Sequence, residues 1–361
     1  MSTTTRPAGR RLTAIAVLAA SVAILAAACS SSSATTAPSA AAPATTAPSV
    51  EASTSAAAAA CTPETGTFKM GTEPWLGYGP WWVADNKGLF KQNGLDVKVS
   101  SFTTDDEINA ALVAGQIDGA NIATHTAMRL AQAGTPITAV LVLDQSNTAD
   151  AVLAAPPVTS IADLKGKKIA YEEGTTSDIL LRYALSQNGM TINDVVKVPT
   201  SAADAGTAAI AKRVDAAVTY EPYLTAALQQ DPNFKLIYTA DQKPGLISDV
   251  FVVRNDVLGN RPCQIQTLIK TWGDAVAYYN SNGDDAKAII AKAVGATPDD
   301  LKTAFDGVKI YDLAEAKALL KGDFATTMTD IMKIAVAAGI MPAEIDPTQI
   351  LDTTFIDKVA P

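Results

Sequence analysis

The sequence contains a single histidine, His125, and only three cysteines in 361 residues. One histidine cannot form a two-histidine zinc motif, and the cysteines are too far apart in sequence for a Cys-x-x-Cys centre. A Gly-x-Ser-x-Gly elbow, a P-loop and a Gly-x-Gly-x-x-Gly fingerprint are also missing. No residue context supports a Ser–His–Asp site around His125. We therefore expect no enzyme activity, no metal and no cofactor.

Basic residues are outnumbered. The chain has 28 Lys and Arg against 37 Asp and Glu, which gives a formal net charge of −9 at pH 7. Proteins that bind nucleic acid need basic patches to neutralise phosphates. We therefore expect no nucleic-acid partner.

Residues 1–28 have the composition of an export signal. Three arginines precede the 17-residue apolar run 12–28, and small residues stand before Cys29. This order is typical of a signal peptide, and the letters LAAAC resemble a bacterial lipobox, in which the cysteine is lipidated. We expect an exported lipoprotein, anchored through Cys29 to the outer face of the cell membrane. The alternative is an uncleaved anchor, because the run is just long enough to span a bilayer.

A segment poor in large apolar residues follows the signal. Residues 30–60 are almost only Ala, Ser, Thr and Pro, and such a composition buries too little apolar surface to fold. We assign 29–66 to a disordered tether and expect folded sequence from Thr67. Cys61 and Cys263 remain outside the lipobox. An extracytoplasmic location permits a disulfide between them, and the sequence leaves open whether they pair.

From Thr67 onward, short strand-like runs alternate with helical ones, which predicts an α/β fold with mostly parallel sheets. The alternation restarts after Pro156-Pro157, and from Pro262 the chain is nearly all helix. We expect two lobes, lobe I from 67–152 and 251–361 and lobe II from 153–250. Two lobes connected twice would form a hinged clamp around a cleft.

An internal repeat supports related lobes. LVAGQIDGANIAT (112–124) aligns without a gap with AIAKRVDAAVTYE (209–221), so that Asp118 matches Asp215 and Thr124 matches Glu221. Both segments run from a helix end through a turn into a strand. The loops that follow should therefore lie at the carboxyl ends of parallel strands, where open α/β sheets bind ligands.

The loops after the predicted strands are rich in aromatic and polar residues, which is how small-molecule sites are usually built. The candidate ligand-binding residues are Trp75, Tyr78, Thr124, His125, Asp144, Ser146, Thr175, Thr176, Ser177, Tyr220, Glu221, Tyr223 and Asp249.

Each candidate also has an ordinary structural role. Residues 175–177 can cap the helix that they precede, Asp144 can cap a turn, and His125 can be a solvated residue at a helix start. Glu221-Pro222 is the clearest case. Proline suits the first helical position, and a carboxylate is favoured beside a helix N-terminus.

Four motifs carry a family resemblance: WLGYGPWWVADNKGLFKQNGLDVKV, ALVAGQIDGA, SIADLKGKKIAYEEGT and RVDAAVTYEPYL. In this order they resemble the nitrate/sulfonate/taurine (NitT/TauT) family of ABC-transporter substrate-binding proteins, which overlaps the THI5-like pyrimidine-binding group. The resemblance covers about residues 67–260. It implies a type II periplasmic-binding-protein fold that captures a small solute and delivers it to an ABC permease and its ATPase. We also expect a monomer.

The family leaves the ligand open. The candidate residues come from six loops, which contain eight Asp and Glu residues but no Lys or Arg: 73–81, 123–126, 144–150, 171–178, 219–223 and 245–249. A buried carboxylate needs a partner, so a guanidine-, urea- or aminopyrimidine-like solute fits on charge. Taurine or another sulfonate is the alternative, because helix N-termini bind anions through backbone N–H groups. Two further functions stay open: a sensor that presents solute to a membrane signalling partner, and a THI5-like enzyme, although the chain lacks the His/Cys-rich region of those synthases.

Overall fold

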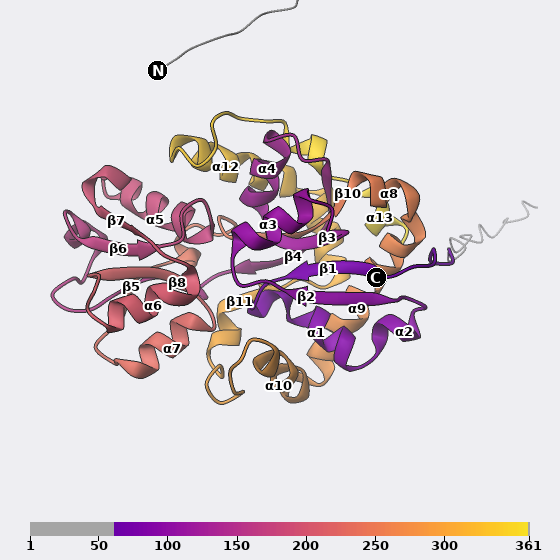
Figure 1. Ribbon diagram of the computed structural model, residues 1–361, viewed down its shortest axis with the longest axis horizontal. Helices are drawn as coiled ribbons and strands as arrows, with labels where there is room; N and C mark the ends of the chain where they lie inside the picture. Colours follow the sequence, from indigo (N-terminus) through magenta and orange to yellow (C-terminus); the bar gives the residue numbers. More distant parts are fainter. Residues whose placement is uncertain (1–60, 360–361) are drawn as a thin grey trace, which may run out of the picture. The chain divides into compact units, whose positions relative to one another are not determined.

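Two β-sheets, each flanked by helices, organise residues 61–359, the part of the chain that the computed structural model describes (Figure 1). These residues belong to one compact unit. The predicted signal peptide, Cys29 and most of the predicted tether lie outside the described residues. Within residues 61–359, no helix is both long and apolar enough to cross a membrane.

The first sheet has six strands in the order β11-β4-β10-β3-β1-β2. Their bounds are β1 (Phe68–Thr72), β2 (Val97–Ser101), β3 (Gly119–Ala123), β4 (Ile137–Ser146), β10 (Ser248–Arg254) and β11 (Val308–Ile310). Strands β1, β2 and β3 pair in parallel, whereas β10 pairs antiparallel with β3 and β4. The short strand β11 lies in the segment that was predicted to be nearly all helix, and it pairs antiparallel with β4.

The second sheet has five strands in the order β7-β6-β8-β5-β9. Their bounds are β5 (Asp150–Ala154), β6 (Lys168–Tyr171), β7 (Val196–Pro199), β8 (Ala216–Tyr220) and β9 (Lys235–Thr239). Strand β6 pairs in parallel with β7 and β8, and β5 runs antiparallel to β8 and β9. We call each sheet with its helices a lobe: the first lobe contains β1, and the second contains β6.

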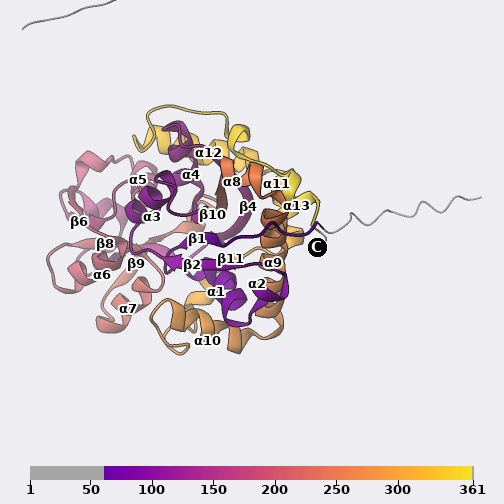
Figure 2. The same cartoon turned by 45° about the vertical axis from the view of Figure 1, so that its right-hand side comes forward.

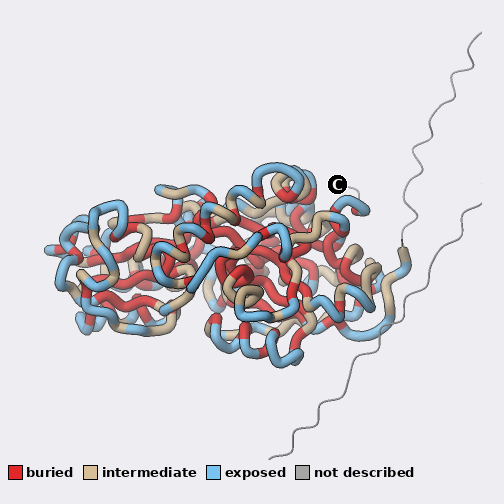
Figure 3. The backbone as a smooth tube through the Cα atoms, turned by 90° about the horizontal axis from the view of Figure 1, so that it is seen from above, coloured by how far each residue is buried: buried red, intermediate tan, exposed pale blue. Residues whose placement is uncertain are grey.

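Helices cover both faces of the sheets, which explains why the central strands are buried and mostly apolar. The helices are α1 (Gly79–Asn86), α2 (Leu89–Gln92), α3 (Asp105–Val113), α4 (Thr124–Gln132), α5 (Thr176–Gln187), α6 (Ala202–Ile210), α7 (Tyr223–Gln230), α8 (Asn255–Asn260), α9 (Pro262–Ser281), α10 (Gly283–Ala293), α11 (Leu313–Lys321), α12 (Phe324–Ala337) and α13 (Thr354–Asp357). In Figures 1 and 2, α5 lies on one side of the second sheet and α6 and α7 lie on the other. Figure 3 shows the buried segments running through the interior of both lobes.

The chain crosses between the sheets earlier than the predicted lobe boundaries. Strand β5 begins at Asp150 in the second sheet, and β10 begins at Ser248 in the first. Residues 150–152 therefore belong with the second lobe and 248–250 with the first. Alternating hydrophobicity reveals that these strands exist, but it does not reveal which sheet a crossing strand joins. Both crossing strands pair in the interior of their sheets, and both run antiparallel to the neighbouring strands.

The internal repeat is confirmed by matching contacts. The Asp118 carboxylate accepts a hydrogen bond from the Lys69 backbone N–H at 2.8 Å, and Asp215 accepts one from the Lys168 N–H at 2.8 Å. Each aspartate precedes a strand that pairs in parallel with the strand of its lysine. The repeated Asp therefore fixes the register between β1 and β3 in the first lobe and between β6 and β8 in the second.

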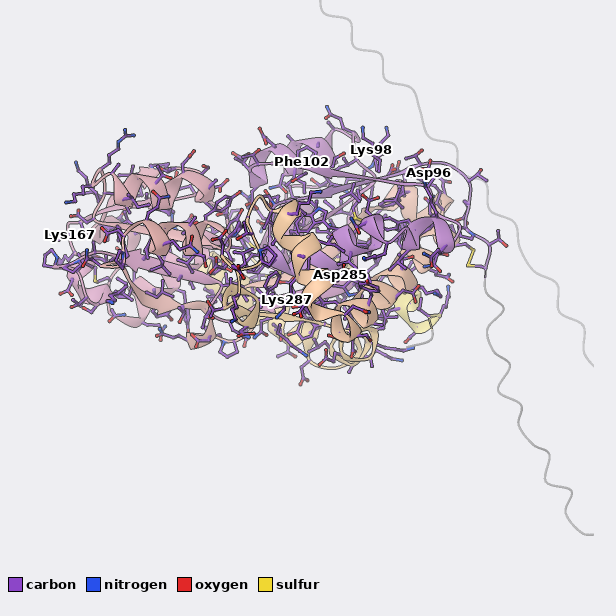
Figure 4. All side chains as sticks on the ribbon, turned by 90° about the horizontal axis from the view of Figure 1, so that it is seen from below. Asp96, Lys98, Phe102, Lys167, Asp285 and Lys287 are labelled. Atoms are coloured by element: carbon purple, nitrogen blue, oxygen red, sulfur yellow. A yellow bond between two sulfur atoms is a disulfide. The ribbon has the colours of Figure 1, made fainter. Side chains whose placement is uncertain are left out.

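The described residues begin at Cys61, within the predicted tether, and residues 61–66 are tied to α9. Cys61 forms a disulfide with Cys263, with the Cα atoms 5.5 Å apart (yellow bond in Figure 4). The Glu64 carboxylate accepts hydrogen bonds from the backbone N–H groups of Cys263 and Gln264, at 3.2 and 2.7 Å. A carboxylate at these N–H groups satisfies the start of α9, which otherwise has no internal partners there.

Reduction of this disulfide should lower the free energy of unfolding by about 2–5 kcal/mol, because the cross-link restricts the unfolded chain. Chemical denaturation with and without reductant measures the difference. The double variant Cys61→Ser/Cys263→Ser is the control, since its stability should not respond to reductant. Equal stability of the oxidised and reduced wild-type protein would contradict the prediction.

Candidate functional site

A cavity of about 30 Å³ is lined by residues of both lobes. The lining residues are Glu73, Trp75, Tyr78, Asp105, Ala123, Asp150, Thr176, Tyr220, Ile247 and Asp249. Most of them follow the carboxyl ends of parallel strands or stand at the starts of the antiparallel strands β5 and β10. Both positions fall on the same edge of a sheet, so the topology brings these side chains together.

An aromatic contact joins the two lobes at the cavity. The rings of Trp75, after β1, and Tyr220, at the end of β8, lie edge to face with centroids 5.8 Å apart. Tyr223 packs against Tyr220 at 5.5 Å. Edge-to-face pairs of this kind contribute about 0.5–1.5 kcal/mol beyond the area that they bury. The contact therefore helps to hold the lobes together around the cavity.

Two aspartates lie opposite each other on neighbouring strands, close to Trp75 and Tyr78. Asp144 of β4 and Asp249 of β10 are partners in the antiparallel register. The Trp75 indole N–H donates to Asp144 Oδ1 and the Tyr78 hydroxyl donates to Asp249 Oδ1, both at 3.0 Å. A Cβ at position 77 would overlap the Asp144 carboxylate, so glycine at this position permits the close approach.

Burial raises the pKa of both aspartates. The pKa of Asp144 rises to about 7, and the pKa of Asp249 rises well above its usual range because of burial and of the negative charge of Asp144. Both residues are at most 3% exposed. Two buried carboxylates in contact cannot both be ionised without a large electrostatic cost.

Three further carboxylates line the cavity. Burial raises the pKa of Asp105 and of Asp150 to about 7, and that of Glu73 well above its usual range, with Asp105 adding to the rise. Glu73 is 6% exposed, and its Oε1 has no hydrogen-bond partner among the described residues. No Lys or Arg of residues 61–359 is among the lining residues. The cavity therefore lacks a positive charge of its own to balance these acids.

Five of the predicted site residues line the cavity. They are Trp75, Tyr78, Thr176, Tyr220 and Asp249. Asp144 lies behind the cavity, where it contacts Trp75 rather than capping a turn.

The other predicted candidates lie beside the cavity without lining it. Thr124 donates to the Ser248 carbonyl at 2.9 Å, and Thr175 caps α5 by accepting from the Ser177 N–H. His125 is buried rather than solvated, and burial, with the charge of Arg129, lowers its pKa to about 4. The hydroxyls of Ser146 and Ser177 are buried without a hydrogen-bond partner among the described residues. Tyr223 packs against Tyr220, which lines the cavity.

Glu221 faces its own helix. Its carboxylate accepts from the Thr225 N–H at 3.0 Å and from the Thr225 hydroxyl at 2.8 Å, at the start of α7. Glu221 is not among the cavity-lining residues. The geometry favours the capping role over ligand contact, because the two hydrogen bonds engage both carboxylate oxygens.

Sequence analysis missed Asp105 among the site residues, and it left Glu73 and Asp150 out of the candidate set. Asp105 starts α3 directly after the loop that follows β2, and Thr104 caps this helix. Acidic residues are favoured in the first turn of a helix by its dipole, so the sequence position of Asp105 does not by itself indicate a binding site. The loop after β2 was not among the candidate loops, although it follows a parallel strand of the first lobe, so the same topological rule would have found Asp105.

We expect Glu221→Ala to lower the free energy of unfolding by about 1 kcal/mol, because α7 loses its cap. Ligand affinity should stay within about twofold of the wild type, since the carboxylate does not line the cavity. Thr225→Val is the matched variant, because it removes the hydroxyl partner and leaves the carboxylate in place. Calorimetric unfolding and ligand titration measure the two effects. A large loss of affinity at unchanged stability would assign Glu221 to the ligand instead.

The ligand-free protein should lose stability as the pH rises from about 4 to about 7. Asp105, Asp144 and Asp150, with pKa values of about 7, hold protons in the folded state that the unfolded chain has already released. His125, with its pKa lowered to about 4, acts in the opposite direction within the same range, but it is one group against three. Thermal unfolding across this range tests the sign, and Asp150→Asn should flatten the dependence. Stability that increases with pH would contradict the assignment.

Comparison with known proteins identifies the fold. The crystal structure of the periplasmic aliphatic sulphonate binding protein SsuA from Escherichia coli superposes with a TM-score of 0.69 at 21% identity, covering 80% of this chain and 93% of that chain. The chain therefore has the predicted two-lobed periplasmic-binding-protein fold.

Sequence comparison identifies the family. A Brucella abortus (strain 2308) protein, provisionally named a binding protein, is 27% identical over 268 residues, which cover 73% of this chain and 83% of that protein. The Saccharomyces cerevisiae enzyme 4-amino-5-hydroxymethyl-2-methylpyrimidine phosphate synthase THI11 is 32% identical, but only over 29% of this chain and 32% of the enzyme. The model of the family described as NMT1/THI5 like matches residues 76–286, more than half of the chain. The chain belongs to the NMT1/THI5-like family.

Proposed function

We propose that the protein is an extracytoplasmic solute-binding protein of an ABC importer, and that it captures a small nitrogen-rich solute in the cavity between its lobes. The observation that carries the ligand class is the acidic, base-free lining, in which the buried Glu73 Oε1 has no partner among residues 61–359. A buried carboxylate without a partner is costly, and an N–H-bearing ligand would satisfy it.

The family and the fold support the transport role. The Brucella relative is named as a binding protein, and the E. coli structure is that of a periplasmic binding protein. We propose that ligand closes the lobes and that an ABC permease with its ATPase receives the closed form. Export as a monomeric lipoprotein anchored through Cys29, without catalytic activity, completes the proposal.

The charge of the cavity argues against a sulfonate here. The E. coli protein is named as an aliphatic sulphonate binding protein. In this chain an anion in the same place would meet Glu73, Asp105, Asp150 and Asp249. Like charges within a buried site repel strongly, because little water screens them. A guanidinium, an amidine or an amine gains from the same field.

A thermal-shift screen of the purified protein tests this function. Guanidinium, urea, methylammonium and an aminopyrimidine form one group of compounds, and taurine, an alkanesulfonate and nitrate form the other. A ligand at 100 times its dissociation constant should stabilise the protein by about 2.7 kcal/mol. We expect shifts from the nitrogen-rich group only. Shifts from the anions alone would overturn the ligand class, and no shift from any compound would overturn the binding role for these solutes.

Variants of the lining refine the screen. Glu73→Gln should weaken the best nitrogen-rich ligand roughly tenfold to a hundredfold, because a hydrogen bond to a charged group is worth about 1.5–3 kcal/mol. Glu173→Gln is the matched control. Its carboxylate pairs with the exposed Lys197 at 3.0 Å and does not line the cavity.

A further inference from the structure

The Asp144–Asp249 pair has an unusual set of neighbours. One oxygen of each carboxylate accepts from a fixed donor, Trp75 N–H for Asp144 and Tyr78 O–H for Asp249. The second oxygen of Asp144, Oδ2, is buried and lacks a hydrogen-bond partner among the described residues. Only Asp249 of the two lines the cavity. One aspartate thus faces the ligand, and the other stands behind it.

The titratable groups around the pair do not supply a positive charge that would balance the two carboxylates. The titratable groups whose charges act on the pair, or are acted on by it, are Glu73, Tyr78, Asp105, Asp150 and Tyr311. These come from every side of the pair: the segments after β1 and β2, the start of β5 and the end of β11. All are acids. Arg129, which does not line the cavity, lowers the pKa of Asp105 through its charge.

A pair of contacting carboxyls in such surroundings is stable with one proton shared between them. The proton supplies the donor that Asp144 Oδ2 otherwise lacks, and it removes one of the two charges. A cation bound in the cavity beside Asp249 would also balance one of the two negative charges. The proton and the cation therefore compete for the same negative charge.

We propose that the Asp144–Asp249 pair holds one proton while the cavity is empty and releases it when a small organic cation binds, so that the protein exchanges a proton for a charged ligand. This inference rests on the proposed function and narrows it from nitrogen-rich solutes to permanently charged ones. In the exchange, the O–H bond of the pair breaks, the proton passes to solvent, and the cation forms an ion pair with Asp249. The total charge of the site stays constant.

Proton release on ligand addition is the direct test. Neutralised guanidinium chloride is added to the weakly buffered protein at about pH 7, and the released protons are counted with an electrode. Urea, which has nearly the same shape without the charge, is the matched ligand. Guanidinium should release up to about one proton per protein from the pair, and urea none. Guanidinium affinity should rise with pH, approaching tenfold per unit while the pair is protonated, and level off above.

Asp144→Asn isolates the contribution of the pair. The asparagine Oδ1 can still accept from Trp75, and its N–H₂ can donate to Asp249, so the variant resembles the permanently protonated pair. We expect proton release to fall by up to about one proton relative to the wild type, and guanidinium affinity at about pH 8 to fall to the low-pH value of the wild type. Glu173→Gln, outside the cavity, should behave like the wild type.

If Asp144→Asn does not fold, an infrared difference spectrum of the wild-type protein tests the proton release instead. Guanidinium binding to the wild type should bleach the C=O band of a protonated carboxyl group. Cation binding without proton release and without this bleach would overturn the exchange while leaving the proposed function intact. Equal release by the wild type and Asp144→Asn would assign the proton to other carboxyls and also overturn it. If neither guanidinium nor methylammonium binds, the exchange falls together with the proposed ligand class.

Discussion

The burial of several carboxylates in one cavity is the constraint on which the site depends. Glu73, Asp105, Asp150 and Asp249 come from four separate elements, and each lies where a strand ends or a crossing strand begins. Removing one such charge from water costs several kcal/mol unless a partner is present. The protein provides partial compensation through the Trp75 and Tyr78 donors and through raised pKa values. The remaining compensation must come from protons or from a ligand.

The N-terminus of α5 also interacts with a buried carboxylate of the cavity. Thr176 is the first residue of α5 and lines the cavity, and a helix N-terminus favours a negative charge. A hydrogen bond from the Thr176 side chain lowers the pKa of Asp150, although burial has the larger, opposite effect. The protein thus places its own carboxylate where a bound anion would otherwise be favoured. A fold shared with a sulphonate-binding protein can in this way present a site of opposite charge preference.

The fold was predictable because it rests on local patterns. Alternating strands and helices, and the repeated Asp118 and Asp215, follow from residue order, and the family and fold predictions are confirmed. The site was only partly predictable. Glu221 and Asp105 are both acidic residues that follow strands, yet one binds its own helix and the other lines the cavity. Sequence places a residue on a loop, but the direction of its side chain depends on packing across both lobes.

The same carboxylates can also control the opening of the lobes. The contacts that join the lobes include the packing of Trp75 on Tyr220, the hydrogen bond from Arg182 to the Ala338 carbonyl at 2.8 Å, and the one from Gln229 to Asp300 at 3.3 Å. Opening would admit water to the buried acids and relieve their desolvation, so an empty cavity favours separation at the crossing segments 147–149 and 240–247. A bound cation removes that advantage, because the acids then have a partner inside. Under the proposed function, in which the ligand is a small cation, closure and ligand recognition depend on the same electrostatic balance.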